Sequence, residues 1–475
     1  MSDSITATMA DQIRRFVAEH RDDLSRDLAD WVRIPSISAD PGCAADVEAS
    51  AQWFADALRA TGFPTVEIWP TAGHPAVFAE WPSDDPDAVT VLVYGHHDVQ
   101  PVDPEELWTS PPFEPLIVGE GDDAELRGRG AIDDKGQLVF HLLGLRAHLA
   151  VTGRTSPAVN LKFLVEGEEE SSSPHFAGLL EDRRDRLACD VIVVSDTTMF
   201  DANTPSICTS MRGMLACHID VFGPDQDLHS GLFGGAVPNP LHALTGLLAA
   251  LHDADGAVAI PGFYDDVIPL TEAERKNFVS LPFDEADWLA GTARSQATFG
   301  EGGFGTLERI GARPTAEING AWGGHIGPGF KTLIPAEAHA KVSFRLVAGQ
   351  DPAHVLKLFR DFVTVNTPDG IRIEIRPEGD GVRPCAIAID HPANQALARA
   401  MGRAFKREPL FTREGGSGPE ADLADTLQAP IVFLGVGLPD DGFHAPNERA
   451  RLRFLYKGAE AAAYLWSELV DLPRG

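Results

Sequence analysis

Polar side chains follow one of the most apolar segments of the chain. The run "AVTVLVYG" leads directly into "HHDVQP", so that His96, His97 and Asp98 stand where a buried strand is expected to end. Buried imidazoles and carboxylates are costly unless they are paired or bind a metal ion. The segment is therefore either a satisfied polar turn or the first part of a metal site, and the short His-x-Asp pattern alone favours neither.

Three further apolar segments lead into residues of the same types. They are "FLVEG", "VIVVS" and "IVFLGVG", each typical of a buried strand. The polar residues that follow them are Glu168, Glu169, Glu170, Asp196 and His444, and Asp133 and Asp134 begin a predicted helix in "RGRGAIDDKG". Alone, each could be a helix cap, a solvated acidic loop or an ordinary loop histidine. Ligands bind at the carboxyl ends of strands in α/β sheets, so the whole set favours a metal site.

The donor atoms of these side chains indicate which metal ions would suit them. Two histidines and several carboxylates, with no cysteine among them, form a mixed nitrogen and oxygen set suited to Zn²⁺, Mn²⁺ or Co²⁺. Carboxylates can also bridge two ions, an arrangement typical of two-metal hydrolases. The strand ends therefore predict hydrolytic chemistry if the fold brings them together.

The elements that must position these residues alternate along the first part of the chain. Strands and helices follow one another from "TVEIW" to "DVIVVSD", and the central strands are continuously apolar. This pattern is typical of an α/β domain with a mixed, largely parallel sheet flanked by helices. The pattern returns after His391, so we predict one discontinuous domain formed by residues 1–211 and 384–475.

The middle of the chain has a different pattern. "MLACHIDVFG", "HAKVSFRLV" and "IRIEIRPEG" alternate apolar with polar residues, as half-exposed antiparallel strands do, and helical segments lie between them. We predict that residues 212–383 form an inserted α+β domain. Its apolar segment "LHALTGLLAALHD" is expected to be a helix that provides a self-complementary surface for a two-fold dimer.

Composition limits the partners and the compartment. The 475 residues include 39 Lys plus Arg against 71 Asp plus Glu, a formal net charge of −32. This charge repels nucleic acids and anionic membrane surfaces, so neither is expected as a partner. Five scattered cysteines, a polar N-terminal segment and the lack of a membrane-length apolar run predict a cytoplasmic protein.

Seven segments spread over nearly the whole chain carry a family resemblance. They are "YGHHDVQP", "RGRGAIDDKG", "EGEEESSS", "VVSD", "DLHSGLFGG", "REGGS" and "GFHAPNE". In this order they resemble the motifs of the two-metal peptidases that include carnosine dipeptidases, carboxypeptidase G, aminoacylase and succinyl-diaminopimelate desuccinylase. "DVQP", "DDKG" and "DLHSGLFGG" are similar to the dipeptidase branch. The resemblance implies two divalent metal ions per subunit, with zinc as the first expectation and manganese or cobalt as alternatives.

The resemblance also implies roles in the metal centre. His96 and Asp196 would bind the first ion. Glu170 and His444 would bind the second, and Asp133 would bridge both. The inserted domain would serve as a lid and in dimerisation.

Three neighbours of these ligands are interpreted in the same way. Asp98 would orient His96 and tune its basicity. Glu169 would be the general base that takes a proton from the attacking water and delivers it to the leaving amine. His97 stands where relatives carry an apolar residue, so we interpret it as a supporting or packing residue.

The substrate-binding residues are expected in and near the inserted domain. The resemblance implies that His229 reaches the active site of the partner subunit in a homodimer, whereas the residues alone leave it as a histidine beside a glycine-rich turn. Arg345 would hold a substrate carboxylate with two parallel hydrogen bonds, and Ser417 would complete that site. The chain departs from the dipeptidases in "GGSGPEADL", where Glu420 is either a substrate-site residue or an acid at a helix start.

These expectations predict metal-dependent hydrolysis of dipeptides or short peptides with a free C-terminal carboxylate. The alternative within enzymes is an N-acyl amino acid deacylase with the same metal centre. The alternative from another class is a peptide-binding homologue without activity. The chain retains every expected ligand and the expected base, which favours an enzyme.

Overall fold

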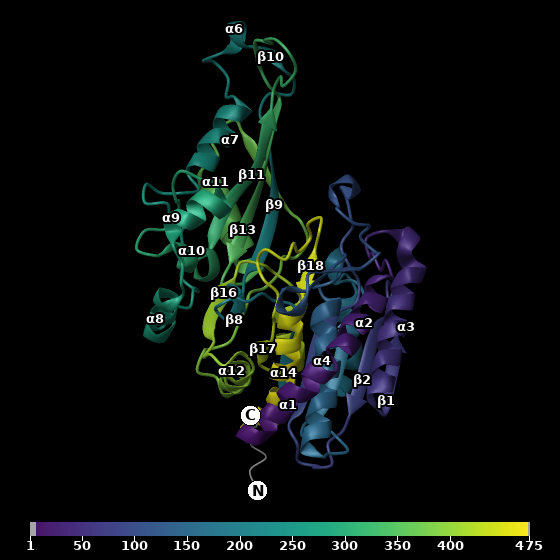
Figure 1. Ribbon diagram of the computed structural model, residues 1–475. Coiled ribbons are helices and arrows are strands. Elements are labelled where there is room, and N and C mark those ends of the chain that lie inside the picture. The colour runs from purple at the N-terminus through teal and green to yellow at the C-terminus, as the bar shows by residue number, and fades with distance from the viewer. Residues whose placement is uncertain (1–5, 474–475) are drawn as a thin grey trace. The chain divides into compact units, whose positions relative to one another are not determined.

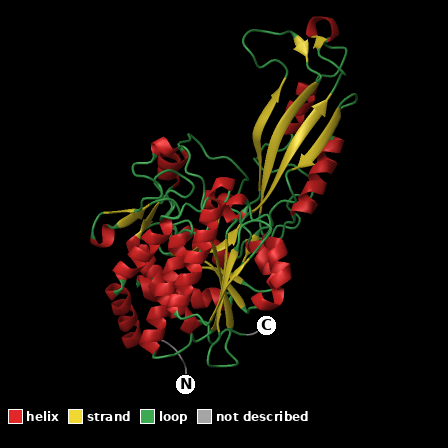
Figure 2. Cartoon of the chain, turned by 90° about the vertical axis from the view of Figure 1, so that its right-hand side faces the viewer, coloured by secondary structure: helices red, strands yellow, loops and turns green. Residues whose placement is uncertain are grey.

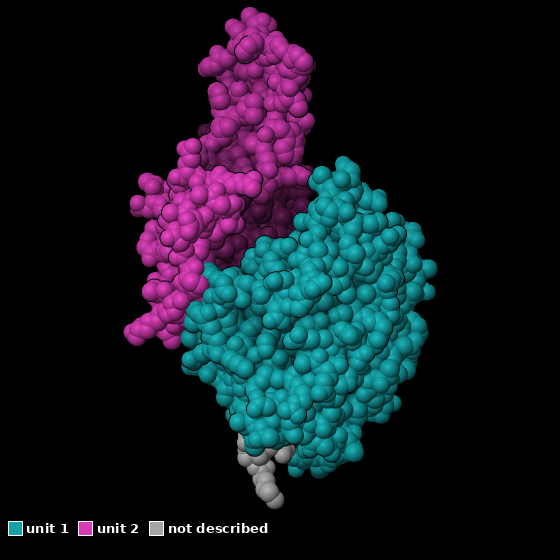
Figure 3. Space-filling model, in the orientation of Figure 1, with its two compact units in different colours: residues 1–209, 387–412, 422–475 teal, residues 210–386, 413–421 magenta. Residues whose placement is uncertain are grey.

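The computed structural model describes residues 6–473, which fall into two compact units, each described here by itself (Figure 3). The first unit contains the described residues up to 209, residues 387–412 and those from 422 onward. The second contains residues 210–386 and 413–421, so the "REGGS" segment belongs to it rather than to the first. The assignment of catalytic and lid roles to the predicted domains stays a prediction.

The first unit is built around a six-stranded sheet. Its strands in spatial order are β1 (Thr65–Trp69), β2 (Ala76–Trp81), β6 (Asn160–Glu166), β3 (Thr90–His96), β7 (Val191–Val194) and β17 (Ile431–Phe433). The last four run parallel, and β1 and β2 form an antiparallel edge. The predicted α/β class with a mixed, largely parallel sheet is confirmed (Figure 2).

Helices accompany this sheet, and one of them is central. They are α1 (Ala7–Glu19), α2 (Arg21–Val32), α3 (Ala44–Thr61), α4 (Lys135–Thr152), α5 (Phe176–Leu187), α12 (Pro392–Phe405) and α14 (Leu452–Glu468). α4 is buried on nearly all sides, as expected of a helix that is apolar all round. A Cβ at Gly144 would lie 2.7 Å from the Ala459 carbonyl oxygen, so glycine permits α4 and α14 to pack closely.

The parallel strands end at one edge of the sheet, and the predicted site residues follow those ends. β3 ends at His96 itself, and β7 ends at Val194, just before Asp196. The register pairs His96 with Glu166, so β3 and β6 end level with each other. Asp133 precedes α4 and lies beside His96 at the same edge.

The second unit contains a four-stranded antiparallel sheet. Its strands in spatial order are β11 (Thr315–Gly323), β13 (Glu337–Leu346), β9 (Gly213–Phe222) and β14 (Arg372–Pro377). Buried and accessible residues alternate along β13, and the buried ones pack with α7 (Pro240–Ala249) and α11 (Pro352–Val365). This arrangement is the predicted α+β architecture with half-exposed strands.

The outer face of α7 differs from the apolar surface that the sequence suggested. Leu244, Leu247 and Leu248 are buried in the core of the second unit. The residues that α7 leaves exposed are His242, Thr245, Gly246 and Ala249. These three leucines are therefore not available to a partner, because they already cover the sheet of their own unit.

Shorter elements complete the chain (Figure 1). The strands are β4 (Leu116–Val118), β5 (Glu125–Arg127), β8 (Ser206–Met211), β10 (Leu228–His229), β12 (Leu333–Ile334), β15 (Cys385–Ala386), β16 (Leu410–Glu414) and β18 (Arg449–Arg451). The helices are α6 (Ser230–Phe233), α8 (Glu272–Ser280), α9 (Glu285–Trp288), α10 (Thr306–Ala312) and α13 (Glu420–Leu427). Within residues 6–473 no helix has the length and apolarity needed to cross a membrane.

Candidate metal centre

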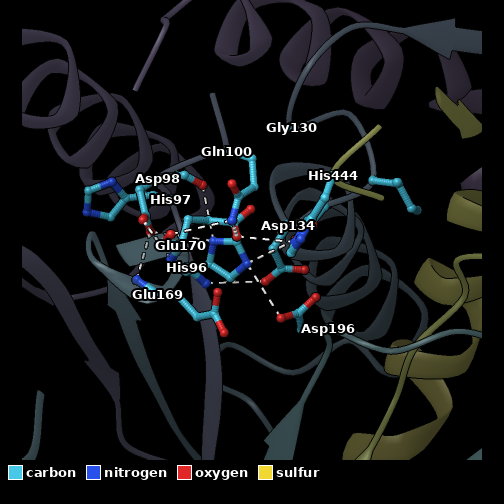
Figure 4. A network of polar contacts seen from close by, with 12 residues as sticks. His96, His97, Asp98, Gln100, Gly130, Asp134, Glu169, Glu170, Asp196 and His444 are labelled. Atoms are coloured by element: carbon cyan, nitrogen blue, oxygen red, sulfur yellow. Dashed lines mark hydrogen bonds and ion pairs between the residues drawn. The ribbon is translucent and has the colours of Figure 1, made fainter. Parts of the chain in front are cut away.

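One group of potential ligands lies at the end of β3. His96, Asp133 and Asp196 each offer a donor atom, and these atoms lie within 4.8 Å of one another. His96 Nε2 is 3.1 Å from Asp133 Oδ1 and 3.5 Å from Asp196 Oδ2. His96 and Asp133 are buried, and Asp196 is half-buried. One imidazole nitrogen and two carboxylate oxygens in this arrangement suit a divalent cation (Figure 4).

A second group shares one member with the first. Asp133, Glu170 and His444 also bring their donor atoms within 4.8 Å of one another. His444 Nε2 lies 3.1 Å from Asp133 Oδ2 and 3.2 Å from Glu170 Oε2. Asp133 therefore directs one oxygen toward His96 and the other toward His444. A carboxylate that joins two ligand groups in this way is the arrangement that a pair of bridged cations requires.

Asp98 contacts a residue of each ligand group. His96 Nδ1 lies 3.1 Å from the carbonyl oxygen of Asp98 and 3.5 Å from its carboxylate. The carboxylate accepts hydrogen bonds from the backbone N–H groups of Glu169, at 3.3 Å, and Glu170, at 3.1 Å. The buried side chain of Asp98 thus fixes the Glu169–Glu170 backbone, a contact that the sequence did not reveal, and its backbone oxygen is the nearer partner of His96.

The electrostatics of the centre call for positive charge. Burial lowers the pKa of His96, but hydrogen bonds to Asp133, Asp196 and Asp98 outweigh it and raise the pKa well above the usual value. Hydrogen bonds to Asp133 and Glu170 raise the pKa of His444 to about 10. Burial raises the pKa of Glu170 to about 7 and that of Glu169 well above its usual range. So many buried carboxyl groups around two imidazoles fit divalent cations.

The two carboxylate oxygens of Glu170 differ in their contacts. Its Oε2 accepts a hydrogen bond from the Gln100 side-chain amide at 2.7 Å. Its Oε1 is buried and has no hydrogen-bond partner among the described residues. An orphaned buried carboxylate oxygen is uncommon, and a cation at the second group would satisfy it. Gln100, in "DVQP", was not among the predicted site residues, although its motif was quoted.

Glu448 is a second residue that the sequence did not reveal. Its side chain is completely buried, and its two oxygens accept hydrogen bonds from the backbone of the loop that carries Asp133. Oε1 accepts from Ile132, at 2.9 Å, and Asp133, at 3.1 Å, and Oε2 accepts from Gly130 at 2.9 Å. Glu448 also follows His444 closely in "HAPNE", so one side chain connects the loops that carry two of the proposed ligands.

Arg129 completes this buried contact. Its Nη1 donates to Glu448 Oε2 at 2.8 Å, and its Nη2 donates to the Pro101 carbonyl oxygen at 3.1 Å. The guanidinium also lies 5.2 Å from the ring centroid of Trp108. The pair therefore connects three loops, those that follow β3, precede α4 and precede β18. Only the motif "RGRG" and the terminal Glu of "HAPNE" could have indicated it, and neither names a partner.

His97, interpreted from the resemblance as a supporting or packing residue, is buried and packs within its unit. Its ring is buried, its Nε2 lies 2.9 Å from the Pro75 carbonyl oxygen, and burial lowers its pKa to about 4. A Cβ at Gly167 would lie 2.7 Å from the His97 ring, so the histidine packs against the chain that leaves β6.

Two of the predicted substrate-binding residues are neighbours within the second unit. Arg345 Nη1 donates a hydrogen bond to Ser417 Oγ at 2.9 Å. His229 lies elsewhere in the unit, on β10, where its exposed ring accepts a hydrogen bond from the Gly231 backbone at 3.0 Å. Glu420 is buried at the start of α13. The structure thus brings Arg345 and Ser417 together and leaves His229 separate from them.

The sequence was compared with families of known proteins. The family model described as peptidase family M20/M25/M40 matches residues 92–468. The chain belongs to this family. The human Beta-Ala-His dipeptidase is 30% identical over 99% of this chain and 95% of its own length. The Cys-Gly metallodipeptidase of Saccharomyces cerevisiae is 30% identical over 92% of this chain and 94% of its own length.

Solved structures of the M20 family have the same fold. An M20 family metallo-carboxypeptidase from Sulfolobus solfataricus has a TM-score of 0.77 at 28% identity, over 94% of this chain and 99% of its own. Human carnosine dipeptidase 1 has a TM-score of 0.74 at 29% identity, over 98% and 99%. The predicted membership of the two-metal peptidases, dipeptidase branch, and the predicted class of hydrolase are confirmed.

Proposed function

We propose that this M20 peptidase hydrolyses dipeptides or short peptides that have a free C-terminal carboxylate. The observation that carries the proposal is Asp133, whose two carboxylate oxygens face His96 and His444 respectively. The names of the human and yeast relatives, a Beta-Ala-His dipeptidase and a Cys-Gly metallodipeptidase, support a dipeptide as substrate.

Two divalent cations per subunit are the proposed cofactors. Zinc is the first candidate, and manganese and cobalt are the alternatives. His96, Asp133 and Asp196 would hold one, and the second group, which shares Asp133, would hold the other through Glu170 and His444. When bound, they would supply an acidic water and positive charge for the substrate carbonyl. Imidazole and carboxylate donors without thiolate fit these metals.

Glu169 is the proposed general base. Its backbone is fixed by the Asp98 carboxylate, which leaves its own carboxyl group free to exchange a proton. Glu169 would take the proton of the attacking water and then donate it to the amine that leaves. Its neighbour Glu170 has a different task, because its Oε2 already accepts from Gln100 and lies beside His444.

Arg345 and Ser417 are the proposed site for the C-terminal carboxylate. A guanidinium presents donors in a planar fork that matches a carboxylate, and Arg345 has a hydroxyl rather than an acid as its hydrogen-bond partner. The same carboxylate occurs in N-acyl amino acids, which is why a deacylase remains the second candidate function.

A homodimer in which His229 serves the partner subunit is also proposed. β10, which carries His229, pairs with β12, and α6 lies beside β10 (Figure 1). Exposed apolar side chains lie on the segments next to this pair. They are Leu232, Phe233, Ile326 and Phe330. An exposed apolar cluster of this kind favours an interaction surface. Since Leu244, Leu247 and Leu248 of α7 are buried, this cluster replaces them as the apolar part of the proposed interface.

One assay tests the proposed function against both alternatives. The zinc-loaded protein is incubated with Ala-Leu, β-Ala-His and N-acetyl-leucine, and free amino acids are measured by chromatography. Release from a dipeptide supports the proposal, whereas release from N-acetyl-leucine alone identifies a deacylase. No release from any of them, with bound zinc verified by elemental analysis, overturns the enzyme assignment and leaves a peptide-binding homologue.

A further inference from the structure

Arg212 lies beside the proposed carboxylate site, in the connection between β8 and β9. Its backbone N–H donates to the Gly416 carbonyl oxygen at 2.9 Å, and its own carbonyl oxygen accepts from Ser417 Oγ at 2.6 Å. A Cβ added at Gly415 would lie 2.9 Å from Arg212 Nη2, so the guanidinium packs directly over that glycine. The "GGS" segment thus holds both the backbone and the side chain of Arg212.

Arg345 is a close neighbour of Arg212. Arg345 on β13 pairs with Met214 on β9, two residues after Arg212, and Arg345 donates to the same Ser417 hydroxyl that donates to the Arg212 carbonyl oxygen. Burial and, to a smaller extent, the charge of Arg345 lower the pKa of Arg212 to about 10, against a smaller opposing effect of Glu317. Two cationic side chains therefore stand close enough to repel each other.

Neither arginine has a carboxylate partner among residues 6–473. The side chain of Arg345 donates to the Ser417 hydroxyl, and Arg212 Nε is buried without a hydrogen-bond partner. In a chain with 71 acidic and 39 basic residues, two adjacent arginines that form no ion pair with an acid are unexpected. Both arginines are half-buried. A charge removed from water is costly unless it is paired, so an anion bound between them would offset that cost.

The Ser417 hydroxyl has no proton left to donate to such an anion. A hydroxyl has one O–H, and the Ser417 O–H is directed to the Arg212 carbonyl oxygen. The other contact of this hydroxyl is the hydrogen bond that it accepts from Arg345. Ser417 therefore contributes to the carboxylate site by positioning the two arginines, and the guanidinium groups are the donors that remain for a ligand.

We propose that Arg212 is the second cation of the substrate-carboxylate site, and that the free C-terminal carboxylate of the substrate is the ionic partner that Arg212 and Arg345 both lack within the protein. The inference rests on the proposed function and adds a specificity to it. The enzyme selects substrates that end in a free carboxylate over the corresponding amides, and Arg212 is one source of that selection.

The experiment compares Ala-Leu with Ala-leucinamide, which differ only in the terminal charge. Arg212→Gln is expected to lower kcat/KM for Ala-Leu by about 10- to 100-fold, the effect of losing one charge-assisted hydrogen bond. The same variant should leave kcat/KM for Ala-leucinamide within about twofold of the unmodified enzyme. Arg212→Lys keeps the charge but not the planar fork, so its kcat/KM for Ala-Leu is expected to lie between those of Arg212→Gln and the unmodified enzyme. This second variant guards against the case in which Arg212→Gln fails to fold.

Arg376→Gln is the matched control, because Arg376 lies on β14 of the same sheet and already pairs with Asp220 at 2.7 Å. This variant should leave kcat/KM unchanged for both Ala-Leu and Ala-leucinamide. Equal losses for acid and amide in both Arg212 variants would identify a purely structural role and overturn the inference, as would no loss at all.

Binding to the zinc-loaded Glu169→Gln protein provides a measurement that does not depend on turnover. Calorimetry in this background should show weaker binding of Ala-Leu, but not of the amide, when Arg212 is also replaced. If the unmodified enzyme hydrolyses no dipeptide, the proposed function fails, while selective loss of Ala-Leu binding would still support the role of Arg212. Unchanged Ala-Leu binding would overturn that role.

Discussion

Glu448 Oε1 accepts a hydrogen bond from the backbone N–H of Asp133 at 3.1 Å. The two residues are far apart in sequence, yet this contact and those to Gly130 and Ile132 place a fully buried carboxylate directly behind the residue that joins both ligand groups. Because Glu448 also belongs to the loop of His444, its side chain links that loop to the loop of Asp133. The geometry of the metal centre thus depends on a residue that need not touch a metal ion.

Replacement of Glu448 is therefore expected to weaken metal binding. In Glu448→Gln one acceptor oxygen becomes an N–H₂ group that faces backbone N–H groups or Arg129, so at least one hydrogen bond is lost and Arg129 loses its ionic partner. Supporting residues of this kind change metal affinity by about 10- to 100-fold. Zinc affinity measured by competition with a chelating dye should fall within that range, at a temperature where the variant is still folded.

Glu460→Gln is the control for the loss of a buried carboxylate. Glu460 lies on α14 and pairs with Lys457 at 2.9 Å, away from the ligand loops. It is expected to retain the zinc affinity of the unmodified protein. A zinc affinity within about twofold of the original in Glu448→Gln would contradict the positioning role.

The adjacent Glu169 and Glu170 should respond differently to the same substitution. Glu169→Gln is expected to keep both metal ions and to lower kcat by about 100- to 10,000-fold, the usual contribution of a general base. Glu170→Gln removes the oxygens beside His444 and should reduce the metal content. Elemental analysis and steady-state kinetics of both variants check this. If Glu169→Gln loses metal and Glu170→Gln does not, the two roles are reversed.

His141 should make the protein sensitive to acid. This α4 residue is completely buried beside Ser195, with Nε2 at 2.7 Å from Oγ, and burial lowers its pKa from 6.5 to about 3. Between these two pH values the unfolded chain binds a proton that the folded chain does not, so stability falls as pH falls. His141 adds up to about 1.4 kcal/mol per pH unit to this slope.

The measurement compares urea unfolding of the unmodified protein and His141→Gln from pH 7 to pH 4. Both samples contain a chelator, so that metal release does not differ between them. The slope should be shallower in the variant below about pH 6.5. His354→Gln, which removes an exposed histidine of α11, is the control and should retain the original slope. Identical slopes for all three proteins would show that His141 is not the group responsible.

The positions of His96 and Asp196 at the edge of the sheet could be predicted from sequence because they follow directly from strand periodicity. An apolar run that ends in His96 or just before Asp196 fixes both the strand and the edge at which the side chain emerges. The α/β class and the α+β pattern of the second unit follow from the same periodicities. Each of these features depends on residues that are close together in the sequence, so each could be predicted without the structure.

The contacts that sequence could not provide all join distant segments. Glu448 acts through backbone N–H groups, which every residue type except proline possesses, so nothing in the sequence near Gly130 identifies its partner. The association of residues 413–421 with the second unit arises from tertiary contacts such as that between Ser417 and Arg212. The leucines of α7 could equally have faced a partner, and only the structure shows that they cover their own sheet.

The proposed exchange of His229 between subunits can be tested by mixing two inactive proteins. His229 is exposed and has only a local hydrogen bond, to the Gly231 backbone, so its replacement by alanine should leave the fold intact. In a mixed dimer, the His229→Ala chain keeps Glu169 and receives His229 from the Glu169→Gln chain, so one of the two centres is complete. Dissociation and random reassociation should therefore restore about a quarter of the original activity on Ala-Leu.

Adding Leu232→Asp should abolish this recovery, because Leu232 belongs to the exposed apolar cluster beside β10. Subunit exchange is verified independently with differently tagged chains. Proven exchange without any recovery would mean that His229 serves its own chain or has no catalytic part.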